Sequence, residues 1–452
     1  MRYRKAPILA GVACAIVALV WLGSETRSET GPPFYLGGIQ VNEPDHVRWI
    51  ETLSEIGMNT VSVTVYARQG AWDSDDLRFN VAEPAVVDEI RSAKSAGLHV
   101  VLILRVALDH AFPQNEFIWH GMIMPRTDAL IDSWFFKYAR FVTMWAEIAE
   151  KEGVDVLGIG SEMNALTATL PIGGIGNLRN YYVYTWYQRL QHRRALGFAD
   201  DLEHKGVWLP WREDHPSLEA YLDARLAKQL AWAGQAYLRS EDNVLRKINE
   251  RRRRINDHWV RLIGRTRTVF DGKLTYAANF DAYQNVGFWR HLDLMGVNSY
   301  FPLRDGVDDG APPGRLPEIF RNRWRTILAE IQRFKERQGL PRTPILFTEL
   351  GLTFRENCTV EPWSHSGFSI LPGRSGRKLV IWGEQPANPD ERRMALEALH
   401  AVYREDYGSL LKGILYWKLS TIRSHARIEP YVLHIGSGST DALQDVLVRF
   451  GR

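Results

Sequence analysis

The stretch Val154-Asp-Val-Leu-Gly-Ile-Gly-Ser-Glu-Met-Asn164 contains the two features that decide the fold. Its first part is a short, largely apolar run of the kind that a buried strand of a parallel sheet requires. Glu162 comes just after that run. The stretch Pro344-Ile-Leu-Phe-Thr-Glu-Leu350 repeats the arrangement and places Glu349 after its apolar residues. Both stretches therefore predict buried parallel strands that end in a carboxylate.

Apolar runs of this kind recur along the chain, with amphipathic stretches between them. The runs, including the two above, lie at about 35–41, 59–65, 98–104, 154–160, 274–278, 294–298, 344–348 and 413–417. Helices are predicted at about 47–56, 84–96, 130–152, 317–338 and 389–406. Eight strands alternating with helices are typical of the α/β class and predict a (β/α)8, or TIM, barrel. An open doubly wound sheet is the alternative, but no Gly-rich phosphate loop follows the first strand.

The interval from about 165 to 272 departs from this rhythm. It opens with a Gly-rich stretch at 173–176, continues with the aromatic cluster Tyr181–Tyr187, and ends in a helical section at about 218–270. We expect a large, mostly helical insertion after the fourth strand, at the end of the barrel where active sites lie. The aromatic cluster is either the core of this insertion or a substrate contact. The basic run Arg251–Arg254 is expected to be a solvated helix face.

The composition is that of a globular protein. Of the 452 residues, 45% are hydrophobic and 24% are charged, and a formal net charge of +3 gives no reason to expect a nucleic-acid partner. The 16 Trp and 17 Tyr suit the binding of sugar rings, although cores use them too. Thirteen His show no His-Glu-x-x-His spacing, so neither a metal nor another cofactor is expected. Ser161 does not lie in a Gly-x-Ser-x-Gly elbow, which disfavours a serine hydrolase.

Residues 1–30 are predicted to be a separate N-terminal segment, and 31–452 to be the barrel domain. Basic residues precede an uncharged run from Ala6 to Gly23, which at about 1.5 Å per residue barely spans a bilayer core. The run is either a signal peptide or a membrane anchor, and the poor cleavage site that follows it favours the anchor. Basic residues before such a run stay cytoplasmic. We therefore expect an exported, periplasmic or otherwise extracytoplasmic protein held at the inner membrane.

Glu162 and Glu349 are the candidate catalytic residues. The carboxyl ends of all barrel strands meet at one face, where the active site lies. Two carboxylates across this opening can divide the work of glycoside cleavage: one attacks the anomeric carbon, and the other protonates the leaving oxygen and later activates water. The alternative is that each glutamate only caps a strand or pairs with an arginine. Asp109, just beyond the third strand, is either a further sugar-binding group or the ion-pair partner of Arg105.

Five sequence motifs, taken in order, carry a family resemblance. They are Ile-Gly-Ser-Glu162-Met, Leu-Thr-Tyr-Ala-Ala-Asn279-Phe, Met-Gly-Val-Asn298-Ser-Tyr300-Phe-Pro-Leu303, Phe-Thr-Glu349-Leu-Gly and Leu-Tyr-Trp417-Lys. With these motifs the chain resembles the clan A glycoside hydrolases, most of all glycoside hydrolase family 113, the β-mannanase family. It is also similar to TIM-barrel proteins of phage-like gene transfer agents. The resemblance covers about residues 33–420, with the interval at 165–272 unmatched.

The resemblance implies a mechanism and roles for individual residues. It implies cleavage with retention of configuration, with Glu162 as acid/base and Glu349 as nucleophile. It also implies that Tyr300 hydrogen-bonds the nucleophile and that Trp417 forms the floor of the subsite for the attacked sugar. In a retaining enzyme the two carboxyl groups lie about 5–5.5 Å apart, and we expect that separation here.

Other residues near the motifs are candidates for substrate binding. Asn279 and Asn298 lie within the matching motifs. The wider clan often places an Asn before the acid/base to bind a sugar hydroxyl, whereas this chain has Ser161, closer to family 113. Where the family tends to show Trp-Arg-Gly, this chain has Trp119-His120-Gly. The histidine changes the charge beside the cleft and leaves mannan open as the substrate.

The sequence thus predicts a retaining glycoside hydrolase that acts on an extracytoplasmic polysaccharide, with a β-mannan-type chain as first candidate. Two alternatives stay open. One is a non-catalytic glycan-binding barrel in a polysaccharide export or cell-envelope assembly. The other is a glycosidase that acts on an exopolysaccharide or on peptidoglycan. Two strand-end glutamates favour an enzyme, because a binding barrel does not need both of them.

Overall fold

The computed structural model describes most of the chain after the N-terminal segment. It describes residues 34–173, 220 and 244–452, apart from gaps at 82, 110, 113–114, 116–118, 305–312, 365–367, 373–377 and 383–385. The predicted N-terminal segment and the aromatic cluster Tyr181–Tyr187 lie outside the described residues. Within the described part, no helix is both long and apolar enough to cross a membrane.

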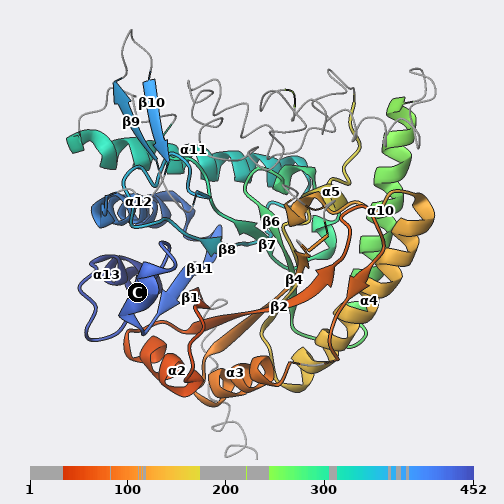
Figure 1. Cartoon of the computed structure of the whole chain (residues 1–452), viewed down its shortest axis with the longest axis horizontal. Coiled ribbons are helices and arrows are strands. Elements are labelled where there is room, and N and C mark those ends of the chain that lie inside the picture. The colour runs from red at the N-terminus through yellow and green to blue at the C-terminus, as the bar shows by residue number, and fades with distance from the viewer. Residues whose placement is uncertain are drawn as a thin grey trace, which may run out of the picture. The chain divides into compact units, whose positions relative to one another are not determined.

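Eight parallel strands of the described part close into a barrel (Figure 1). They are β1 (Tyr35–Gln40), β2 (Thr60–Gln69), β4 (His99–Leu108), β5 (Val156–Ser161), β6 (Lys273–Asn279), β7 (Met295–Asn298), β8 (Ile345–Leu350) and β11 (Leu411–Ser420). Each pairs with its neighbours in chain order, and β1 closes the ring by pairing with both β2 and β11. All eight predicted strands are present, and the predicted (β/α)8 barrel is confirmed.

Glycines let β1 approach its two neighbours closely. A Cβ atom on Gly37 would lie 1.6 Å from the carbonyl oxygen of Thr60 in β2. One on Gly38 would lie 2.5 Å from the carbonyl oxygen of Tyr416 in β11. Contacts this short are impossible for a side chain, so the closing point of the barrel requires both glycines.

The interior of the barrel is a packed apolar core. Side chains from different strands meet there: Tyr35, Val101, Ile103, Val156, Ala277, Leu294, Leu346 and Leu415. These positions alternate with outward-facing ones along each strand, as the period of two in a strand requires. Because the interior is filled, polar chemistry is confined to the end of the barrel.

Helices cover the outside of the strands (Figure 1). They are α2 (His46–Glu55), α3 (Pro84–Ser95), α4 (Asp128–Lys151), α10 (Val244–Thr266), α11 (Leu316–Arg337) and α12 (Pro389–Val402). The side chains of Asp45 and Thr127 cap the first turns of α2 and α4 by accepting backbone N–H groups. Helix α4 buries a face rich in large aromatic side chains, including Trp134, Tyr138 and Trp145.

The described residues also form shorter strands and helices outside the barrel strands and the main helices. They are β3 (Leu77–Arg78), β9 (Phe368–Pro372), β10 (Lys378–Trp382), β12 (Leu433–His434), α5 (Asn164–Thr167), α13 (Leu443–Val448) and a 3-10 turn at His120–Met122. Strand β3 pairs antiparallel with the far end of β2, and β9 and β10 form a separate antiparallel hairpin.

Helix α10 packs on the barrel beside α4 (Figure 1). Trp259 of α10 stacks on Phe288 with ring centroids 5.0 Å apart, and its indole N–H donates to the carbonyl oxygen of Leu166 at 2.8 Å. It also contacts Tyr276 of β6 edge to face. Helix α10 therefore acts as the barrel helix that follows the fourth strand. The prediction placed this helix inside an insertion that ends at about residue 272.

The basic run of α10 is only partly solvated. Arg252 is buried and donates to the carbonyl oxygen of Leu170, while Arg251 donates to that of Pro125 at 2.6 Å. The expectation of a solvated face is therefore wrong for these two arginines. Their guanidinium groups tie α10 to the loops around it.

Candidate active site

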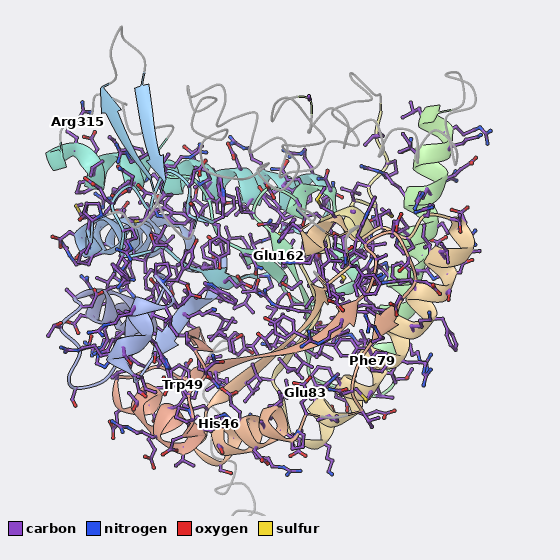
Figure 2. All side chains as sticks on the ribbon, in the orientation of Figure 1. His46, Trp49, Phe79, Glu83, Glu162 and Arg315 are labelled. Carbon is purple, nitrogen blue, oxygen red and sulfur yellow. The ribbon has the colours of Figure 1, made fainter. Side chains whose placement is uncertain are left out.

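Glu162 and Glu349 lie at the carboxyl end of the barrel. Glu162 directly follows β5, and Glu349 is the penultimate residue of β8. Both are buried, with 8% and 2% of their surface exposed. Figure 2 shows Glu162 inside the ring of elements, whereas His46 and Trp49 come from α2 on its outside. The ends of two strands far apart in the chain thus contribute carboxylates to one buried polar region.

The carboxylate of Glu349 is held by three groups. The hydroxyl of Tyr300 donates to Oε2 at 2.6 Å, and the side-chain amide of Asn298 donates to Oε1 at 3.0 Å. The guanidinium of Arg105 forms an ion pair with the same carboxylate. Burial raises the pKa of Tyr300 well above its usual value, so its hydroxyl stays protonated and available as a donor. Donors and positive charge favour the ionised form of Glu349.

Asn298 connects the two strands that carry the glutamates. Its amide nitrogen donates to Glu349 and also lies 3.4 Å from the hydroxyl oxygen of Ser161, the residue before Glu162. Its amide oxygen accepts from the hydroxyl of Thr348 at 2.8 Å. Contacts to both the nitrogen and the oxygen therefore fix the orientation of this amide, and its N–H groups face Glu349 and Ser161.

Glu162 occupies an unusual backbone conformation with φ of 53°. A residue other than glycine rarely adopts this region, at a cost of order 1–3 kcal/mol. Its backbone N–H donates to the carbonyl oxygen of Ala277 at 2.9 Å, and the next N–H, of Met163, donates to the buried hydroxyl of Tyr276 at 2.9 Å. Strand β6 therefore holds the turn that aims the Glu162 side chain.

His120 is the direct side-chain partner of Glu162. A hydrogen bond joins His120 Nε2 and Glu162 Oε2 at 3.1 Å, and the imidazole packs on the ring of Trp119 with centroids 4.7 Å apart. Burial alone would raise the pKa of Glu162, but the hydrogen bond and charge of His120, the charge of Arg105 and the Asn298 amide together lower it to about 2. The contacts with His120 thus favour the carboxylate form of Glu162.

Trp417 lies beside these groups at the end of β11. The Arg105 guanidinium carbon is 5.1 Å from the centroid of its ring, and the ammonium of Lys418 is 4.5 Å away. Lys418 is in turn paired with Glu429 at 2.8 Å. The indole is flanked by fixed cations and stays partly exposed, which suits an aromatic surface for a sugar ring.

The sequence profile of glycoside hydrolase family 113 matches residues 40–169 and 193–370, more than half of the chain. The chain belongs to glycoside hydrolase family 113. It is therefore a glycoside hydrolase, as its two strand-end glutamates predicted. A search of curated proteins finds no match to the sequence.

Solved structures of the family share the fold of this family 113 hydrolase. The β-mannanase from Alicyclobacillus acidocaldarius in complex with ManMIm has a TM-score of 0.56 and 17% identity, covering 93% of this chain and 97% of that chain. Two structures described as β-1,4-mannanases of the family give TM-scores of 0.55 and 0.52, each with 16% identity over 93% of this chain and 99% of theirs. At these identities the likeness shows the fold.

The family match corrects the expected extent of the resemblance. The interval 165–272 was expected to have no family counterpart, but the profile covers 193–272 and leaves only 170–192 unmatched within it. Most of the interval is thus family sequence. The match ends at residue 370, so the motif around Trp417 lies beyond the matched residues.

Two other candidate residues of this hydrolase are engaged elsewhere. Asp109 forms an ion pair with Arg78 at 3.3 Å and accepts the backbone N–H of Ala111 at 3.0 Å. The alternative of a pair with Arg105 is wrong, because Arg105 pairs with the carboxylate of Glu349. The side chain of Asn279 is buried and accepts its neighbour's backbone N–H at 3.0 Å, and no described hydrogen bond joins it to either glutamate.

Sequence reasoning missed three members of the site. Arg105 was noted only as a partner for Asp109, although its position two residues after the core residue Ile103 places it on the inner face. Tyr276 and Lys418 lie within two of the quoted motifs, but the motifs assigned neither of them a role. Within the described ranges no group of three or more His, Cys, Asp and Glu side chains is arranged to hold a metal ion.

Proposed function

We propose that this family 113 hydrolase cleaves a β-linked polysaccharide with retention, with Glu349 as nucleophile and Glu162 as acid/base. The observation that carries the assignment is the difference between their partners. Glu349 receives donors from Tyr300, Asn298 and Arg105, which fix it as a carboxylate. Glu162 instead shares a hydrogen bond with the imidazole of His120, and its burial favours the protonated form that an acid needs.

In the first step Glu349 attacks the anomeric carbon while a proton passes from Glu162 to the glycosidic oxygen. The bond between the anomeric carbon and that oxygen breaks, the released chain leaves with a hydroxyl, and a glycosyl ester forms on Glu349. Burial of Glu162 favours the protonated form that this step needs, while its contacts with His120, Arg105 and Asn298 favour the carboxylate form that the second step needs. Arg105 and Tyr300 stabilise the carboxylate before the attack.

In the second step ionised Glu162 takes a proton from water. The water oxygen attacks the anomeric carbon and displaces the Glu349 carboxylate, which restores both glutamates and releases a sugar with its original configuration. The low pKa of Glu162 suits this step, because a carboxylate is the form that accepts a proton. The hydrogen bonds from Tyr300 and Asn298 stabilise the departing carboxylate of Glu349.

A β-1,4-mannan-type chain is the first candidate substrate. The family match and the description of two related structures as β-1,4-mannanases support it. His120 beside the acid/base, where the family tends to have Arg, favours testing exopolysaccharides and peptidoglycan as well. A polysaccharide panel with early product analysis by NMR tests both parts. We expect β-mannan cleavage that releases the β-anomer first. Initial release of the α-anomer would refute retention.

We also propose that the protein is exported and tethered to the inner membrane through residues 6–23. The basic flank and the uncharged run of this segment support the proposal. Full-length protein should fractionate with membranes and keep its own N-terminus. A soluble form that begins near residue 25–30 would show a cleaved signal peptide instead. Recovery in the cytoplasm would reject export.

A further inference from the structure

Strands β2 and β4 have ten residues each and extend beyond the neighbouring strand β5, which has six. They pair in register over their whole lengths, from Thr60 opposite His99 to Gln69 opposite Leu108. Strand β7, by comparison, has four residues. At its far end β2 also pairs with β3, where Arg68 lies opposite Arg78. The carboxyl end of the barrel thus carries an additional wall of paired strands.

One face of this wall is the face that carries the catalytic groups. Ile103 points into the barrel core, so Arg105, which touches Glu349, shares its side of β4. Paired residues of adjacent parallel strands project to the same face. Tyr66, opposite Arg105, and Arg68, two residues further on, therefore lie on that inner face.

The burial pattern of β2 agrees with this orientation. Tyr66 is 43% exposed, and Arg68 is exposed too. Val65, before Tyr66, and Ala67, between Tyr66 and Arg68, are both buried beneath the outer helices. Adjacent strands lie about 4.8 Å apart. The exposed phenol ring is consequently one strand away from the arginine that pairs with Glu349.

These side chains line a cavity of about 420 Å³. Tyr66 provides an aromatic surface, Arg68 and Arg78 provide donors, Glu83 provides acceptors, and Asn80 provides both. An aromatic surface surrounded by mixed donors and acceptors matches a pyranose ring, which has an apolar C–H face and hydroxyls around its edge.

The two arginines that line the cavity differ in their partners. The guanidinium of Arg78 is held by Asp76 at 3.4 Å and Asp109 at 3.3 Å, and lies over the ring of Phe112 at 5.7 Å. Arg68 forms no ion pair within the described residues. Arg78 is therefore a fixed part of the cavity wall, and the guanidinium of Arg68 can donate hydrogen bonds to a bound sugar.

We infer that Tyr66, Arg68 and their neighbours form an outlying pyranose subsite for the same glycan chain that is cleaved between Glu162 and Glu349. This inference rests on the proposed function and deepens it, because a subsite removed from the cleavage point is useful only for a chain of several sugars. The enzyme therefore acts on an oligosaccharide or polysaccharide and gains affinity from sugars that do not react.

Substrates of different length test this subsite. Tyr66→Ala and Arg68→Ala should each lower kcat/KM about tenfold on a β-1,4-manno-oligosaccharide of six units. Both should leave an aryl β-mannoside, which is too short to reach the subsite, unchanged within about twofold. Tyr66→Trp should preserve the long-chain activity, since it keeps an aromatic surface. Phe136→Ala, an exposed aromatic on α4 at 65% exposure, serves as control and should alter neither substrate.

The outcomes separate this inference from the proposed function. If the wild-type enzyme cleaves the oligosaccharide and the Tyr66 and Arg68 variants cleave it equally well, the subsite is refuted and the function stands. Equal losses on long and short substrates would also refute the subsite, because they would show a general defect. If the wild-type enzyme cleaves no glycoside at all, the proposed function fails and the subsite fails with it.

Discussion

At the residue scale, Asn298 links the two candidate catalytic glutamates through its side-chain amide. It touches the carboxylate of Glu349 and the hydroxyl of Ser161, and Thr348 fixes its amide orientation. If the amide were reversed, its oxygen would face the Glu349 carboxylate and repel it. A single side chain thus aligns the strand ends that carry both glutamates, which is a positioning role.

His120 should control the ionisation of Glu162. In His120→Gln an uncharged amide replaces the imidazole, which removes the positive charge that lowers the pKa of Glu162. Burial then dominates, so that pKa should rise from about 2. Carbon-13 NMR titration of the glutamate carboxyls, with Glu162→Gln to assign the signal, measures the change. An unchanged or lower pKa would contradict the assigned role of His120.

The sequence predicted the two candidate catalytic glutamates but not all of the groups that contact them. Glu162 and Glu349 were recognisable because each follows a buried apolar run, and the hydrogen bond from Tyr300 followed from a family motif. The pairing of Arg105 with Glu349 depends on closure of the barrel between strands distant in sequence. No local pattern encodes that distance, so the nearer Asp109 was chosen as an alternative partner.

At the scale of elements, Asp155 joins the start of β5 to its neighbours. Its carboxylate accepts from Lys94 of α3 at 2.8 Å and from the backbone N–H of Val100 in β4 at 2.8 Å, and it is paired with His99 at 2.9 Å. Burial opposes ionisation of Asp155, but these partners outweigh it and lower its pKa to about 2. This end of the barrel is therefore stabilised by one ionised group.

Asp155→Asn should destabilise the protein in a pH-dependent way. A pKa lowered from 3.8 to about 2 corresponds to about 2 kcal/mol, present above pH 4 and lost as the pH falls through 2. The variant should lose roughly that much unfolding free energy at pH 7 by urea denaturation, and much less at pH 2. Glu51→Gln, on the exposed side of α2, is the control. A loss of the same size at both pH values would contradict the electrostatic account.

Helices and strands were predicted correctly where the apolar pattern extends over several residues, and were missed where the segment is too short to carry a pattern. The eight barrel strands were predictable because each contains a short run of mostly apolar or β-branched residues. Strand β3 has two residues, too few for any pattern, yet it forms part of the wall that carries Arg78. Helix α10 was assigned to an insertion because its charged sequence hides a buried face, which includes Ile255 and Trp259.

At the scale of the whole molecule, barrel closure brings the candidate active-site residues together. It places strand ends from the fourth and seventh positions at one rim and fills the interior with apolar side chains. Only the rim is then available for polar groups. Glu162, His120 and Asn298 approach it from three different segments. These segments give the two glutamates different partners, and we propose that the partners assign them different chemical roles.

Azide rescue of the two glutamate variants tests that claim most directly. Glu349→Ala should lose cleavage of every glycoside, including activated aryl glycosides, because no glycosyl ester can form. Glu162→Ala should lose polysaccharide cleavage but still form the ester from an activated aryl β-glycoside, whose leaving group needs no proton. Azide should then speed turnover and yield the β-glycosyl azide, since this anion attacks without a general base. Azide rescue of Glu349→Ala with the α-azide as product would show that the two roles are reversed.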